Sequence, residues 1–202
     1  MINVSEGRDR SVIRRIAAAG GPCLLDVHSD PHHNRSVLTL AGAGVEAAAQ
    51  AVATEAVRDI DLRLHVGVHP RLGAVDVVPF VPLAGASMDD ALAARDRFAA
   101  WAGEHLAVPC FLYGPERSLP DVRRHAFTGL APDTGPPVAH PTAGAICVGA
   151  RPVLVAYNVW LAEGVPVATA RQVAREIRGP GLRALGLDVG GRAQVSMNLV
   201  DP

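Results

Sequence analysis

Aromatic residues are scarce in this chain of 202 residues: four Phe, two Trp and two Tyr make up 4% of it. Hydrophobic residues nevertheless account for 49% of the chain, so the core must be built mainly from Ala, Val and Leu. That share of apolar residues favours a folded globular protein over a disordered one. The length fits one domain of ordinary size or two small ones.

An excess of charge of one sign is also missing, because 19 basic residues face 20 acidic ones. The balance gives no electrostatic reason to expect a nucleic-acid or anionic-membrane partner. No apolar run approaches the roughly 18 residues of a membrane-spanning helix, and MINVSEGRDR lacks the apolar stretch of a secretory signal. The three cysteines lie far apart in apolar settings, which favours buried reduced thiols. We therefore expect a cytoplasmic protein.

Strand-like and helix-like patterns alternate up to residue 114. Asp9 is a candidate cap for a helix, and Ser87 with Asp90 resembles a capping box for a helix over 88–106. Prolines in 74–82 indicate a strand that ends early or lies at a sheet edge. Expected strands cover 23–27, 36–42, 74–82 and 108–114, and a further helix begins near residue 45.

Pro and Gly crowd residues 115–144, where no periodicity is visible, and we place a subdomain boundary there, giving domains 1–144 and 145–202. The order of strands and helices in the first domain is β-α-β-β-α-β with additions. It predicts an α+β, ferredoxin-like layer, which is a mixed or antiparallel sheet with helices on one face. The remainder, β-α-β-β, predicts a partial second α/β subdomain, with 153–161 a strand apolar on both faces. Such a small sheet is marginal alone. We therefore expect it to pack on the first subdomain, on residues beyond this sequence or on another chain, and predict a homodimer or other oligomer.

HVGVHPRLGAVD, residues 65–76, concentrates polar groups in an apolar chain. His65 and His69 are four residues apart, but Gly67 and Pro70 argue against a helix. A metal site would therefore need further ligands from Asp76 or from the histidines at 28, 32 and 33. A solvated loop or structural histidines are the simpler alternatives.

A catalytic interpretation of the same stretch gives each polar residue a task. His69 would transfer protons, because imidazole titrates near neutral pH. Arg71 would bind a carboxylate with its fork of donors. Asp76, early in an apolar strand, would need a partner if buried, and could orient a histidine.

Two other clusters are candidate binding segments. DVHSDPHHNRS, residues 26–36, is either a polar hairpin loop or a substrate rim in which Asn34 and Arg35 are fixed donors. GPPVAHPTAGA, residues 135–145, is either a linker or a segment whose Gly and Pro residues let backbone approach a ligand. It contains no phosphate-binding G-x-x-x-x-G-K pattern.

Together, these segments resemble the formiminotransferase family, nearly end to end and in order. Nothing in the chain resembles the cyclodeaminase domain to which some members are fused. The matching segments are NVSEGRD (3–9), LLDVHSDPHHNRSVLTLAG (24–42), HVGVHPRLGAVDVVPFVPL (65–83), FLYG (111–114), LPDVRR (119–124), HPTAGA (140–145), VGARPVLVAYNVWL (148–161) and AQVSMNLVD (193–201).

The resemblance implies transfer of a formimino group from N-formimino-L-glutamate to the co-substrate tetrahydrofolate, in histidine degradation and one-carbon metabolism, without a metal. His69 maps to the family's catalytic histidine. Asn34, Arg35, Arg71 and Asp76 are expected to bind substrate. The expected folate contacts are Gly135, Pro136, His140, Pro141, Thr142, Ala143, Gly144, Gly181 and Arg183.

One departure from the family concerns the donor. Val66-Gly67-Val68 stands where the family often has Lys-Gly-Glu, so two charged groups near the site are absent. A formyl donor is therefore an alternative to the formimino donor. A truncated or non-catalytic paralogue that binds folate or a partner chain is the alternative from another class.

Overall fold

The computed structural model describes residues 1–67 and 70–200. The chain divides into two compact units, Met1–Arg151 and Pro152–Pro202. The elements of the first unit are β1 (Ile2–Val4), α1 (Arg10–Ala18), the 3-10 helix η1 (Gly21–Cys23), β2 (Leu24–Asp30), β3 (Arg35–Leu40), α2 (Val45–Asp59), β4 (Val75–Phe80), α3 (Met88–His105), β5 (Cys110–Tyr113), α4 (Leu119–His125) and β6 (Ile146–Ala150). Those of the second are β7 (Val155–Trp160), α5 (Val167–Ile177), β8 (Leu182–Val189) and β9 (Arg192–Leu199).

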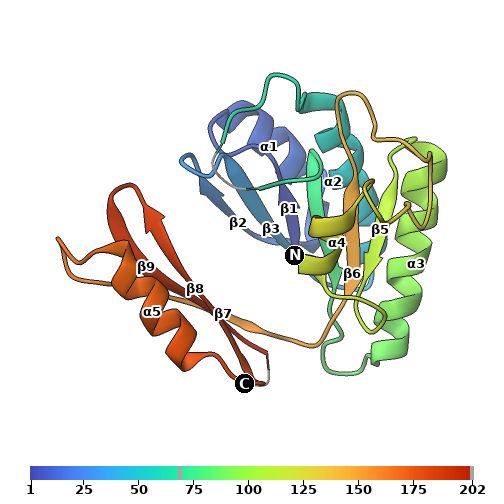
Figure 1. Cartoon of the computed structure of the whole chain (residues 1–202). Helices are drawn as coiled ribbons and strands as arrows, with labels where there is room; N and C mark the ends of the chain where they lie inside the picture. Colours follow the sequence, from blue (N-terminus) through green and yellow to red (C-terminus); the bar gives the residue numbers. More distant parts are fainter. Residues whose placement is uncertain (68–69, 201–202) are drawn as a thin grey trace. The chain divides into compact units, whose positions relative to one another are not determined.

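The first unit is built on a six-stranded mixed sheet with the order β2-β3-β1-β4-β6-β5 (Figure 1). The strands β2, β3, β1 and β4 pair antiparallel, in the order typical of a ferredoxin-like layer. The strands β6 and β5 extend this sheet in parallel beyond β4. The predicted α+β, ferredoxin-like fold is confirmed.

The prolines of 74–82 predict a strand that ends early or lies at a sheet edge, and the strand β4 fulfils only the first alternative. It ends at Phe80, earlier than the predicted 82, but it lies inside the sheet between β1 and β6 and not at an edge. Its pairs with β1 are Asn3 with Val77 and Val4 with Val75, both before Pro79. The backbone N–H that Pro79 lacks would therefore lie beyond the end of β1, where it has no partner in that strand. For this reason an interior strand tolerates a proline at this position.

Both predicted helix caps are confirmed. The carboxylate of Asp9 accepts hydrogen bonds from the backbone of Ser11 and Val12 at the start of α1. Ser87 and Asp90 form a reciprocal capping box at the start of α3. These local contacts explain why the helix starts could be predicted from the sequence.

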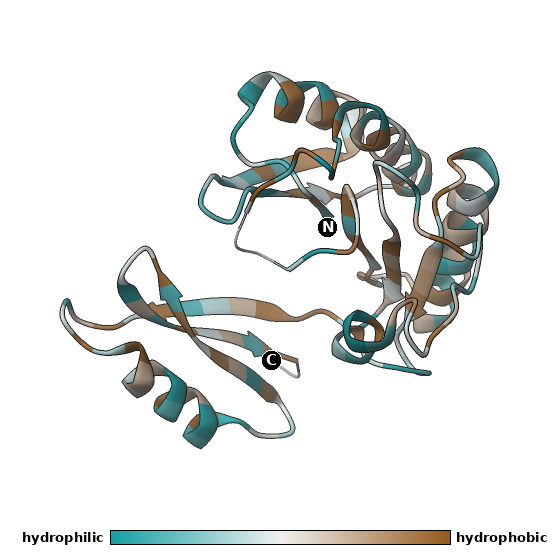
Figure 2. Cartoon of the chain, turned by 45° about the horizontal axis from the view of Figure 1, so that its top comes forward, coloured by the Kyte–Doolittle hydropathy of each residue, from teal (hydrophilic) through white to brown (hydrophobic). Residues whose placement is uncertain are grey.

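The main core lies between the sheet and the helices α1, α2 and α3, and small residues dominate it. α2 alone buries four alanines and Val52, and Phe98 of α3 is fully buried. In Figure 2 the strands of the first sheet are largely hydrophobic, whereas the helices carry hydrophilic residues on their outer turns. All three cysteines are free and buried, as predicted, and burial raises the pKa of the Cys110 and Cys147 thiols to about 12.

The helix α4 lies within residues 115–144, where the sequence shows no periodicity and predicts no helix. Ser118 caps it, and Pro120 stands in its first turn, where proline is tolerated. Its Val122 is fully buried in a second, smaller core with Phe111 and Cys147, on the sheet face opposite the main core. A helix of seven residues with one buried side chain has no visible periodicity, so tertiary packing forms it.

The second unit has the predicted β-α-β-β succession, and its three strands form an antiparallel sheet in the order β7-β9-β8. α5 packs on β8 and β9, with Ala170 and Ala174 buried. The strand β7, predicted to be apolar on both faces, has exposed residues throughout. The boundary predicted at residue 144 precedes β6, which pairs with β4 and β5 and so belongs to the first unit.

Among the described helices, none has both the length and the apolar character needed to span a bilayer.

Candidate active site

The three polar clusters identified in the sequence meet in the first unit. The Leu62 amide donates to the Thr142 carbonyl (2.8 Å), the Ala74 amide to Ala143 (2.9 Å), and the Ala145 amide to the carbonyl of Leu72 (2.9 Å). The segment 140–145 therefore lies along both ends of the stretch 62–74. Side chains from the β2–β3 hairpin reach the same stretch. His69, the predicted catalytic residue, lies outside the described residues, as does Val68.

Asn34 joins the hairpin to this stretch. It is buried and has a left-handed φ of 49°, a conformation that asparagine tolerates better than most residues. Its Oδ1 accepts a hydrogen bond from the Gly7 amide (2.9 Å), and its Nδ2 donates to the Val66 carbonyl (3.0 Å). The Asn34 side chain, predicted to bind substrate, is thus engaged by two backbone groups of its own chain.

His65 and Arg71 form the next contact. The His65 Nε2 lies 3.1 Å from the Asn34 carbonyl oxygen, a group that can only accept a hydrogen bond. The Arg71 guanidinium contacts the ring through Nη1 and donates through Nη2 to the His33 carbonyl (3.2 Å). Burial and the Arg71 charge lower the pKa of His65 below its ordinary 6.5. Both effects favour the neutral form of the His65 ring.

Gly67 is required by close packing at this point. A Cβ there would lie 2.6 Å from the His33 carbonyl oxygen, 2.8 Å from the Asn34 Cβ and 2.9 Å from the Arg71 Nη2. Any side chain at residue 67 would displace the groups that hold Arg71.

Asp76 is almost fully buried, at 1% exposure, and both of its oxygens are engaged. Oδ1 accepts a hydrogen bond from the Leu72 amide (2.8 Å), and Oδ2 forms an ion pair with Arg123 Nη2 (2.5 Å). Arg123 Nη1 also donates to the Pro70 carbonyl (2.9 Å). The sequence indicated that a buried Asp76 needs a partner, but it did not identify Arg123, because α4 was not predicted.

Positive charge is in excess around Asp76. The carboxylate raises the pKa of Arg35 and of Arg71, but burial, the largest effect, and the neighbouring Arg123 lower both. Arg8 adds a further positive charge near Arg71. The chain contains no lysine, so every basic side chain here is a guanidinium suited to bidentate binding of a carboxylate.

The HPTAG turn is closed by its own backbone. His140 and Gly144 exchange amide hydrogen bonds (2.8 and 2.9 Å), and the His140 Nδ1 accepts from the Ala143 amide (3.0 Å) and the Thr142 amide (3.3 Å). Gly144 has a φ of 67°, and a Cβ there would lie 2.1 Å from the Leu72 carbonyl oxygen. The turn is therefore seated against the segment that carries Arg71.

Other predicted folate contacts lie elsewhere. Gly135 packs at the end of α3, where a Cβ would lie 2.9 Å from the Val108 carbonyl oxygen and 3.1 Å from Gly103. Gly181 and Arg183 belong to the second unit, where Gly181 accepts a hydrogen bond from the Val200 amide (2.9 Å). Within the described part of the first unit, the structure thus brings together residues of 33–36, 65–67, 70–76 and 140–145.

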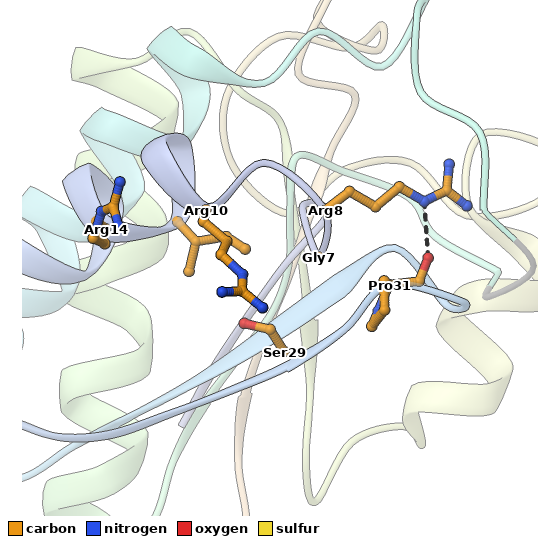
Figure 3. A pocket seen from close by; sticks show the side chains of 7 residues that line it. Gly7, Arg8, Arg10, Arg14, Ser29 and Pro31 are labelled. Atoms are coloured by element: carbon orange, nitrogen blue, oxygen red, sulfur yellow. Dashed lines mark hydrogen bonds between the residues drawn. The ribbon is translucent and has the colours of Figure 1, made fainter.

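A cavity of about 470 Å³ lies between the start of α1 and the β2–β3 hairpin. Arg8, Arg10 and Arg14 contribute to its lining, together with Gly7, Ile13, Ser29 and Pro31 (Figure 3). The Arg8 Nε donates to the Pro31 carbonyl (2.8 Å). The charge of Arg8 also contributes, as the smallest of the effects, to the lowered pKa of His65.

A metal centre was the alternative interpretation of the histidines. Within residues 1–67 and 70–200, no group of three His, Cys, Asp or Glu side chains is arranged to hold a metal ion. The described acidic group of the site, Asp76, is instead occupied by Leu72 and Arg123.

Comparison with known proteins bears on this arrangement. The sequence profile of the formiminotransferase domain, N-terminal subdomain, matches residues 1–151, which is the whole first unit. The chain belongs to the formiminotransferase family. It is therefore a member of a transferase family, and the resemblance inferred from its motifs is confirmed.

Curated relatives within the formiminotransferase family cover nearly the whole chain. It is 39% identical to the glutamate formimidoyltransferase of Streptococcus pyogenes over 98% of its own length and 76% of the relative's. It is 36% identical to that of Thermoplasma acidophilum, of which it covers 75%. It is 37% identical to the formimidoyltransferase-cyclodeaminase of Sus scrofa, of which it covers 43%.

Proposed function

We propose that this formiminotransferase transfers the formimino group of N-formimino-L-glutamate to N5 of tetrahydrofolate, with His69 as the general acid and base. Family membership supports the reaction type. The observation that supports a glutamate-derived donor is the group of guanidiniums, Arg35, Arg71 and Arg123, around the buried carboxylate of Asp76. N-formimino-L-glutamate has two carboxylates, and arginine binds carboxylates through paired hydrogen bonds.

In the proposed reaction the lone pair of N5 attacks the formimino carbon and forms a tetrahedral intermediate. A proton leaves N5, and the glutamate nitrogen needs a proton before its bond to carbon breaks. His69 would accept the first proton and donate the second, which keeps the proton balance within one imidazole. Glutamate and 5-formiminotetrahydrofolate are the products.

The described residues would contribute chiefly by binding and orientation. Arg71 and Arg35 would bind the donor's carboxylates, and Asn34 would hold the backbone of Val66 on the approach to His69. The turn 140–144, together with Gly135 and Pro136 of the same unit, would contact the folate. Holding both substrates in reacting geometry supplies a large part of the rate acceleration in such reactions.

The direct test compares wild type with His69→Ala in a formimino-transfer assay that uses tetrahydrofolate. We expect the variant to be slower by about 100-fold or more, in line with the loss of one general acid-base group. Equal rates would remove His69 from this role.

The donor and the co-substrate are tested separately. N-formyl-L-glutamate, offered in place of the formimino donor, should be transferred more slowly if the proposal is right, and faster transfer would favour the formyl alternative. Isothermal titration with tetrahydrofolate should give a measurable affinity. Absence of heat at high micromolar folate would contradict the proposed co-substrate and also the folate-binding paralogue.

A further inference from the structure

We propose that the Asp76–Arg123 ion pair is a positioning pair that fixes the backbone on both sides of Arg71 and so aims its guanidinium at the donor. The inference rests on the proposed function for the identity of the donor. Neither the sequence motifs nor the family comparison assigns a role to Arg123.

The first observation is that the pair holds both neighbours of Arg71. Arg123 Nη1 donates to the Pro70 carbonyl (2.9 Å), on one side. Asp76 Oδ1 accepts from the Leu72 amide (2.8 Å), on the other. Since the same two side chains form an ion pair with each other (2.5 Å), residues 70–72 are tied to one rigid unit.

The second observation is that the pair comes from well-anchored elements. Asp76 lies on β4, where every residue is buried. Arg123 follows Val122, which is fully buried in the smaller core under α4. A functional side chain is held more accurately when its supporting residues lie on rigid, packed elements.

The third observation concerns charge. The Asp76 carboxylate raises the pKa of Arg71, whereas Arg123 lowers it, so the two partners act on Arg71 in opposite senses. Removing either partner therefore changes the position of the backbone and the charge balance of the donor site together. Removing both restores the balance but leaves the backbone of residues 70–72 without its two contacts.

The test uses Arg123→Gln and Arg123→Lys, with Arg124→Gln as the matched control. Arg124 is the next residue of α4 and forms only an exposed ion pair with Asp121 (3.0 Å). Steady-state rates are measured with each substrate varied in turn. Hydrogen exchange of the Leu72 amide, followed by NMR or on a peptide spanning 70–78, reports on the backbone independently of activity.

For Arg123→Gln we expect the KM of the donor to rise by about 10- to 100-fold, in line with misplacement of a binding group by about an ångström. The KM of tetrahydrofolate should stay within twofold, and exchange at Leu72 should become faster. Arg123→Lys should recover part of the donor KM, because ammonium keeps the charge but lacks the fork that spans Asp76 and Pro70. Arg124→Gln should match wild type in every readout.

The proposal is overturned if Arg123→Gln matches Arg124→Gln in donor KM and in Leu72 exchange, or if both KM values rise equally. If Arg123→Gln does not fold, Arg123→Lys and the double variant Asp76→Asn/Arg123→Gln provide the same comparison. A wild type without transferase activity would refute the proposed function. Leu72 exchange would still decide whether the pair holds residue 71.

Discussion

Two buried polar side chains, Asn34 and Asp76, each hold the backbone of the candidate site by a hydrogen bond. Asn34 binds it at Val66 and Asp76 binds it at Leu72, but their other partners differ in kind. Asn34 is neutral, and its amide satisfies one backbone donor and one backbone acceptor, so it needs no further partner. Asp76 is charged and can only accept, so it requires Arg123 from a helix 47 residues away in sequence. Both side chains thus depend on residues distant in the sequence, but Asn34 is satisfied by backbone groups, whereas the buried charge of Asp76 also needs a side chain of opposite charge.

The largest effect should follow from removing the charged side chain, Asp76. Asp76→Ala leaves Arg123 without its ion-pair partner and the Leu72 amide without an acceptor. We expect about 3 kcal/mol of destabilisation, the lower end for a buried pair, because Arg123 is partly exposed. Urea unfolding can be followed by Trp101 of α3 in a Trp160→Phe background, so that the signal reports on the first unit. A loss below about 1 kcal/mol, a value expected for an exposed pair, would contradict the assignment.

Removing the neutral side chain, Asn34, should lower the free energy of unfolding by less. Asn34→Ala loses two hydrogen bonds and keeps a Cβ in the left-handed conformation, so we expect about 2 kcal/mol by the same measurement. Asn34→Gly loses the same bonds but relaxes the backbone, and should cost about 1 kcal/mol less than Asn34→Ala. If the glycine variant is the less stable of the two, the left-handed conformation is not a source of strain.

The third prediction concerns Gly67, which is closely packed next to Asn34. Gly67→Ala places a Cβ against the His33 carbonyl and the Asn34 side chain, and we expect about 1–2 kcal/mol of destabilisation. Gly129→Ala is the matched control in the same unit, because a Cβ there would meet nothing closer than 4.0 Å. Equal stability of the two variants would show that Gly67 is not closely packed.

The smallest effect is the change in stability with pH that is due to His65, which contacts both Asn34 and Arg71. Because its folded pKa lies below 6.5, the unfolded chain binds the proton more readily. The His65 contribution to stability is therefore present above pH 6.5 and lost as the pH falls below that value. His65→Gln should show a shallower loss of stability between pH 6.5 and 5 than wild type. Parallel pH profiles would contradict the shift.

Much of the fold could be predicted from local signals. Asp9 and the Ser87–Asp90 box mark helix starts because a cap satisfies backbone amides within three residues. The β-α-β-β order of each unit followed from alternating apolar patterns and turn residues. α4 could not be predicted, because one buried valine leaves no periodic pattern in seven residues.

The candidate site was predicted as three separate clusters of polar residues, and the motifs HPR, NR and HPTAG identified the family. Only the chain path brings these clusters together: the pairing of β1 with β3 and β4 places the β2–β3 hairpin and the start of β4 in one sheet. The partner of Asp76, the occupied amide of Asn34 and the lowered pKa of His65 depend on contacts between residues far apart in the chain. Sequence by itself determined which residue types and which local caps and turns are present, because these depend on neighbours in the chain. The tertiary structure decided which of the polar groups are buried together and how they pair, because burial and pairing depend on residues far apart in the chain.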